Sequence, residues 1–294
     1  MSPLLQLHLL ILLIATTAVL GKLISIPAPA LVTWRTALAA LGAFLWVVLR
    51  RRRKMILPAR QVAPLLGIGA IIALHWICFF GAIDLSNVSI CLAGMATTSL
   101  FTAFTEPLFE RRRIRPFEVL LGLLVVVGIG VVAGIERRYL AGLGVALLAA
   151  LLAAVFPVLN RHLVTRGSDP MVMVGWEMAG ACATCLLLLP VLAPDGYATL
   201  FRARGDDWLW ILCLAWACTV FAHGFHIHLL RHLSAYTANL AINFEPVYGI
   251  LAGALIFREY EELRPGFYLG TLAILAANFL HPWLERRQRA TRNP

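Results

Sequence analysis

The hydrophobic positions of this chain form long continuous runs that are separated by short polar connectors. Each run holds about 20 mostly apolar residues, the length that a helix needs to cross the hydrocarbon core of a bilayer. The connectors are too short to fold as a separate soluble domain. The pattern predicts an all-α integral membrane protein with about ten transmembrane helices. The predicted spans are residues 4–24, 30–49, 62–83, 88–109, 116–134, 142–164, 171–192, 208–230, 236–257 and 265–283.

The composition excludes a soluble fold and the charge pattern gives an orientation. Hydrophobic residues occupy 61% of the 294 positions and charged residues 14%, whereas soluble domains hold about 25% charged residues. The net charge of +10 lies in clusters between the runs, at 50–54, 111–115 and 286–292. Positive loops between apolar spans fix membrane topology. We therefore expect both termini in the cytoplasm and no nucleic-acid partner.

Short motifs recur in the same order in the two halves of the chain. His75 precedes Leu85-Ser86-x-x-Ser89, and His223 precedes Leu233-Ser234-x-x-Thr237 at the same spacing. An acidic residue, Glu110 or Glu259, then begins a second shared motif that ends in Arg-Pro. Because each half holds an odd number of spans, the second half enters the membrane from the opposite side. We expect two inverted five-helix repeats, residues 1–138 and 139–294.

These features resemble the drug/metabolite transporter superfamily, in its ten-helix branch with two EamA-type repeats. The resemblance rests on Arg35, the two Leu-Ser-x-x-Ser/Thr motifs, Pro246 ahead of Glu259, and Gly270. One position departs from it, because Thr98 stands where the family often has a proline in the fourth span. The resemblance implies a multi-pass protein of the bacterial inner membrane that exports small organic solutes, often amino acids.

Polar residues inside the spans are the candidates for function, because a charge at mid-bilayer is costly to bury. Glu245 lies near the middle of the ninth span. It either binds substrate or protons, or it is a neutral carboxyl that is hydrogen-bonded to a neighbouring helix. The candidate substrate-binding residues are His75, Trp76, Phe79, Met95, Thr98, Trp176, His223, Asn239, Asn243 and Glu245.

A second group of residues is predicted to control access to the cavity. Two of them are prolines inside spans, each of which frees the backbone carbonyl four residues earlier. Such a proline either opens the helix locally or bends it statically. The candidate gating residues are Lys22, Trp34, Arg35, Pro157, Asn160, Glu177 and Pro246.

Metal transport is suggested by four histidines near the end of the eighth span, at 223, 226, 228 and 232. At about 100° per residue, His228 and His232 share one helix face, whereas His223 and His226 point roughly the other way. No carboxylate stands nearby at ligand spacing. We expect no metal site. The six cysteines all lie in apolar runs and are interpreted as small apolar side chains.

The sequence favours a secondary transporter that exports amino acids, including aromatic ones, by alternating access around a central cavity. The predicted cavity mixes cationic, carboxylic and aromatic groups, which suits a zwitterion. A phosphorylated or nucleotide-linked metabolite is the alternative substrate class, because the cations Lys22 and Arg35 could bind a phosphate group. An intramembrane enzyme is a further alternative, although no catalytic motif is present. We expect no enzymatic activity, no cofactor, a small-molecule solute and the lipid bilayer as partners, and a monomer.

The charge pattern predicts the topology directly. Reporter fusions after Lys54, Arg113 and Arg287 should report a cytoplasmic location, and fusions after Asp84 and Arg138 a periplasmic one. Paired phosphatase and fluorescent-protein fusions measure this. An external C-terminus would contradict the two inverted five-helix repeats.

Overall fold

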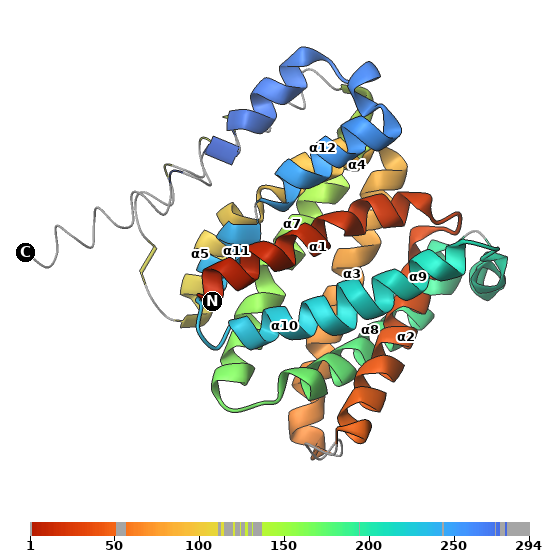
Figure 1. Ribbon diagram of the computed structural model, residues 1–294, viewed down its shortest axis with the longest axis vertical. Helices are drawn as coiled ribbons and strands as arrows, with labels where there is room; N and C mark the ends of the chain where they lie inside the picture. Colours follow the sequence, from red (N-terminus) through yellow and green to blue (C-terminus); the bar gives the residue numbers. More distant parts are fainter. Residues whose placement is uncertain are drawn as a thin grey trace, which may run out of the picture.

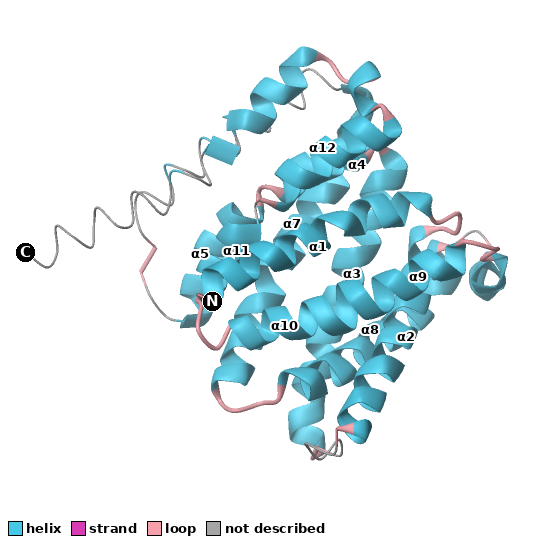
Figure 2. Cartoon of the chain, viewed as in Figure 1, coloured by secondary structure: helices cyan, strands magenta, loops and turns pink. Residues whose placement is uncertain are grey.

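The computed structural model describes residues 2–50, 57–110, 137–193, 195–242 and 244–273, with isolated positions between 113 and 131 and between 275 and 280. These residues form helices and loops, and no strand occurs among them (Figure 2). The helices are α1 Pro3–Leu23, α2 Ala28–Leu49, α3 Ala59–Leu85, α4 Val88–Met95, α5 Thr98–Glu110, α7 Leu140–Thr165, α8 Pro170–Leu192, α9 Asp207–Ala215, α10 Ala222–Leu229, α11 Ala235–Ile242 and α12 Glu245–Phe257. The tighter turns are η1 Arg137–Tyr139, η2 Gly196–Arg202 and η4 Glu259–Glu261, and the π-helical segment η3 Trp216–Phe221 joins α9 to α10.

Among the described residues, seven helical stretches are long and apolar enough to cross a membrane. They coincide with the first four and the sixth to eighth predicted spans. The predicted span 116–134 lies mostly outside the described residues, and of 265–283 residues 265–273 are described and helical. The all-helical, multi-pass architecture is thus confirmed, whereas the number of ten helices stays a prediction. The seven stretches are Pro3–Leu23, Ala28–Leu49, Ala59–Leu85, Val88–Phe109, Arg137–Thr165, Pro170–Leu192 and Asp207–Leu229.

The fourth span is built from two short helices. The first, α4, ends at Met95, and α5 begins at Thr98. At this break the Thr97 hydroxyl donates to the Gly94 carbonyl at 2.8 Å, and the Thr98 hydroxyl donates to the Met95 carbonyl at 2.7 Å. Such side-chain bonds compete with the regular backbone ladder and often bend helices. The fourth span therefore breaks without a proline.

The ninth predicted span is also divided, into α11 and α12. Helix α11 ends at Ile242 and α12 begins at Glu245, so the residues predicted as one helix form two. Pro246 lies in the first turn of α12, where its missing N–H removes no intrahelical bond. The proline thus marks the start of a helix, and the break lies just before it.

Glycines allow the central helices to approach closely. Helix α8 packs extensively against α2 and α3. A Cβ added to Gly69 on α3 would stand 2.0 Å from the backbone oxygen of Glu177, and one added to Gly180 on α8 would stand 2.6 Å from Cα of Leu66. Membrane helices often associate through such small residues, because lipid provides no hydrophobic drive between them. Figure 1 shows α1 crossing this assembly, with α11 and α12 on one side and α9 and α10 on the other.

The crossing of α3 and α8 gives a stability prediction. Gly69→Val should lower the free energy of unfolding by about 1–3 kcal/mol, because its side chain forces the two backbones apart. Gly67→Val is the matched control, since a Cβ on Gly67 meets nothing within 4 Å. Thermal unfolding in detergent, followed by tryptophan fluorescence, measures both. Equal unfolding temperatures for the two variants would contradict the tight crossing.

Candidate functional site

Three irregular parts of the helices border a cavity of about 110 Å³. Met95 and Thr98 line it at the break between α4 and α5, Ile242 and Glu245 at the ends of α11 and α12, and Cys218 from the π-helical η3. The cavity therefore lies where the backbone departs from the regular α-helix. Of the residues predicted from the sequence, its wall contains His75, Trp76, Phe79, Met95, Thr98, His223, Asn239 and Glu245, together with Arg35 and Pro157 from the predicted gating group.

Arg35 on α2 supplies a cation to the cavity wall. Its side chain is 2% exposed, and its guanidinium stacks on the ring of Trp76 at 3.7 Å from the ring centroid. Its Nε donates to Thr219 Oγ1 at 2.9 Å and its Nη2 to the Cys218 carbonyl at 3.4 Å. The third nitrogen, Nη1, is buried and finds no hydrogen-bond partner within the described ranges. The guanidinium thus keeps donor capacity for another group.

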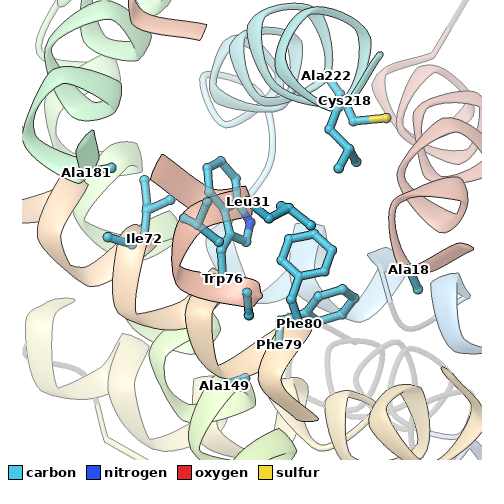
Figure 3. Close-up of a cluster of buried hydrophobic side chains, with 14 of the residues drawn as sticks. Ala18, Leu31, Ile72, Trp76, Phe79, Phe80, Ala149, Ala181, Cys218 and Ala222 are labelled. Atoms are coloured by element: carbon cyan, nitrogen blue, oxygen red, sulfur yellow. The ribbon is translucent and has the colours of Figure 1, made fainter. Parts of the chain in front are cut away.

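The aromatic side chains of α3 frame this cation. Figure 3 shows Trp76, Phe79 and Phe80 grouped on α3 beside Leu31, with Ala18 of α1 and Cys218 of η3 across from them. The ring of Phe80 adds a second face, 5.8 Å from the Arg35 guanidinium. Aromatic faces attract cations and lessen the cost of burying a guanidinium. The stack holds Arg35 in a fixed direction.

Glu245 supplies a carboxyl group to the same cavity. It is 8% exposed and is the first residue of α12, where the helix dipole favours a negative charge. Its carboxyl makes no hydrogen bond or ion pair with the residues that the structure describes, and Arg35 is the charge that acts on it. One cation and one carboxyl group with spare bonding capacity therefore line one cavity.

A polar cluster lies on the side of the cavity formed by α7, α8 and α10. His223 Nε2 is 2.8 Å from Glu177 Oε2, and Asn160 Nδ2 is 3.4 Å from the same oxygen. Glu177 is completely buried, whereas His223 lines the cavity. His75 donates from Nδ1 to the carbonyl of Ala149 at 2.8 Å. The ring of Phe156 contacts the rings of both His75 and His223, with centroid distances of 5.6 and 6.0 Å.

Three predicted residues lie outside the cavity wall, and each contacts a group elsewhere. Lys22 pairs with Glu259 at 3.1 Å. Trp34 donates from Nε1 to the Leu200 carbonyl at 2.9 Å, and the ring of Trp176 packs edge-on against Phe44 at 5.5 Å.

Asn160 and Glu177 are also absent from the wall and reach the cavity only through His223. Asn243 and the side chain of Pro246 lie outside what the structure describes.

The sequence did not single out several parts of the wall. Phe156 stands directly before the predicted Pro157, and its ring contacts both histidines. The π-helical turn at Cys218 and Thr219 has no sequence signal, because a π-bulge is one extra residue in an otherwise normal apolar helix. One indication of these surroundings was present in the sequence. Arg35 is a charged residue inside a span, and such a residue needs polar partners such as carbonyl or hydroxyl groups.

Comparisons with known proteins agree with this architecture. The model of the EamA-like transporter family matches residues 1–134 and again residues 140–281, so two copies of it cover the chain. A solved structure described as "Crystal structure of protein" superposes with a TM-score of 0.68, over 97% of this chain and 98% of that chain, at 18% identity. At that identity the likeness shows the fold alone. No curated protein matches the chain.

The geometry at Arg35 predicts the effect of a conservative change. Arg35→Lys should lower the free energy of unfolding by about 1–3 kcal/mol, because an ammonium group cannot both stack flat on Trp76 and keep the bond to Thr219. Arg50→Lys is the control, since Arg50 covers Trp46 at 4.7 Å but is exposed. Thermal unfolding of both variants measures the difference, and equal effects would contradict the special packing of Arg35.

Proposed function

This chain belongs to the EamA-like transporter family, whose members move small solutes across membranes, and from that premise we propose that it is a secondary transporter that exports small zwitterionic metabolites, with amino acids as the substrate class. The family is one of transporters, so the intramembrane enzyme has no support from it. The proposal includes ten helices in two inverted repeats, both termini in the cytoplasm, and the bacterial inner membrane as the location.

The observation that carries the substrate class is the pairing of two incompletely satisfied groups on one cavity. Arg35 Nη1 has no hydrogen-bond partner, and Glu245 has no hydrogen bond or ion pair, in the described part of the chain. A carboxylate is the natural partner of a guanidinium, and an ammonium group is a natural partner of a carboxylate. An amino acid carries both groups on one carbon atom. It can therefore satisfy Arg35 and Glu245 together without bringing net charge into the membrane.

The size and lining of the cavity refine this proposal. Its volume of about 110 Å³ is small beside the roughly 300–1,000 Å³ of pockets for drug-sized ligands. This conformation therefore suits a small amino acid, and an aromatic amino acid requires the cavity to widen. The rings of Trp76, Phe79 and Phe156 provide an apolar face for the side chain of the substrate.

Phosphorylated and nucleotide-linked solutes are less well served by the observed charges. A phosphate monoester carries a charge of about −2 at neutral pH, so a single cation does not balance it inside the cavity. Lys22 is instead held by Glu259, whose carboxylate also accepts from the backbone N–H of Val88 at 2.9 Å. Within the described residues, Arg35 is the one lysine or arginine side chain that lines the cavity, and Glu245 stands on the same wall. This combination favours a zwitterion over a polyanion.

Alternating access is supported by matching contacts at opposite ends of the two broken helices, α4–α5 and α11–α12. Glu259, which follows α12, caps the start of α4 by accepting from the backbone N–H groups of Val88 and Ser89, both at 2.9 Å. Glu106 on α5 caps the start of α11 by accepting from the backbone N–H of Tyr236 at 3.0 Å. One carboxylate from each half thus caps a broken helix of the other half. Breaking one cap at a time would open one end, as an inverted repeat requires.

Glu245 gives the decisive test of the substrate class. Glu245→Gln should insert normally yet bind amino acids about ten- to a hundredfold more weakly, because a charged partner of the ammonium group is lost. Binding to purified protein and uptake into proteoliposomes measure this. Glu261→Gln is the control, because that side chain is 55% exposed and pairs with Arg258.

Two results would count against the proposal. Unchanged amino-acid binding by Glu245→Gln would show that the carboxyl group is structural. A wild-type protein that responds to no amino acid, but binds a sugar phosphate tightly, would replace the substrate class.

A further inference from the structure

The buried carboxyl group of Glu177 has no role in the zwitterion site described above. It is completely enclosed, and its Oε1 has no hydrogen-bond partner among the described residues. Asn160 Oδ1, in the same cluster, also lacks a donor there. An ionised carboxylate in the middle of a membrane is costly unless a cation or a proton accompanies it. Within the described residues no lysine or arginine pairs with Glu177, so the imidazole of His223, in contact with its other oxygen, is the group that can balance its charge by taking up a proton.

His223 connects this carboxyl group to the cavity. One ring nitrogen, Nε2, lies 2.8 Å from Glu177 Oε2, and the ring itself forms part of the cavity wall. The other nitrogen, Nδ1, makes no hydrogen bond with any residue that the structure describes, and it is not sealed from solvent. A proton can therefore exchange between cavity water and Nδ1, while Nε2–H stays bonded to the carboxylate. Imidazole is suited to this task because it gains and loses a proton near neutral pH.

The other charged and titratable groups near His223 belong to the same cavity. They are His226 on α10, His75 on α3, Arg35 on α2 and Glu245 on α12. Helix α1 contributes only Ile14 and Thr17 to the wall, and α7 contributes Asn160 to the cluster. A positive charge that arrives in the cavity therefore acts on His223 in a medium that screens it weakly.

From this juxtaposition we propose that Glu177 and His223 form a proton-binding site that couples transport to a proton gradient, separate from the groups that bind the substrate. Without substrate the pair holds a proton as imidazolium and carboxylate. When the ammonium group of an amino acid binds beside Glu245, it repels the imidazolium. The N–H bond at Nδ1 breaks, the proton passes to water in the cavity, and the pair is left with neutral imidazole and carboxylate. The result is exchange of an amino acid for a proton.

The inference rests on the proposed function, so the experiment separates the two. Purified protein in proteoliposomes is assayed for exchange of labelled amino acid at equal pH on both sides, and for accumulation driven by an acidic interior. Wild-type protein should show both, and a gradient of about one pH unit can support up to about tenfold accumulation. Glu177→Gln and His223→Gln should keep the exchange and lose the accumulation. His228→Gln, on the same helix but outside the cavity wall, should keep both.

Each result has a distinct consequence. Wild-type protein that exchanges no amino acid overturns the proposed substrate class, and the coupling falls with it. Exchange without accumulation in the wild type, or accumulation retained in either Gln variant, overturns the coupling alone. Because Glu177 is enclosed in the core, Glu177→Gln can fail to insert. His223 lies at the wall, and His223→Gln then decides the question.

Discussion

The hydrocarbon core of a membrane offers no hydrogen-bond partner to a peptide group, and this constraint decides where the chain can depart from a regular helix. Irregular backbone is tolerated at membrane depth only where protein or a water-filled cavity satisfies it. Here the break between α4 and α5, the break between α11 and α12, and the π-helical η3 all border the same cavity. Nearby side-chain hydroxyl groups hydrogen-bond to backbone carbonyls at these irregular segments. Thr219, for example, donates to the Leu214 carbonyl at 2.8 Å. The cavity thus borders three points at which the helices are interrupted.

The buried charges depend on the same packing. An α-helix that approached α8 with an ordinary side chain at position 69 would displace the backbone at Glu177. The glycine lets α3 and α8 touch at the backbone of Glu177. The carboxyl group of this residue contacts His223 on α10. A group that is expensive to bury thus persists because rigid helices hold it against a partner.

The sequence revealed the helices more fully than the contacts between them. Runs of apolar residues predict spans because length and hydropathy are local properties, and Glu245 and Arg35 stood out because charges are rare inside such runs. The partners of Lys22 and Trp176 were not predictable, because Glu259 and Phe44 come close only after folding. The break in the fourth span was missed for another reason. At this break the hydroxyl groups of Thr97 and Thr98 donate hydrogen bonds to backbone carbonyls. Helix breaks are predicted from sequence chiefly at proline and glycine.

In the proposed mechanism, one small cavity serves both a solute and a proton because the two charge systems are separate. Arg35 and Glu245 together are neutral when both are ionised, so a zwitterion adds contacts there without adding net charge. A proton on His223 instead makes the cavity more positive by one unit, and in a weakly polar medium that charge opposes an incoming ammonium group. The two occupants therefore exclude each other by charge, without competing for the same atoms. Exclusion of this kind is the condition under which the gradient of one species can drive the movement of the other.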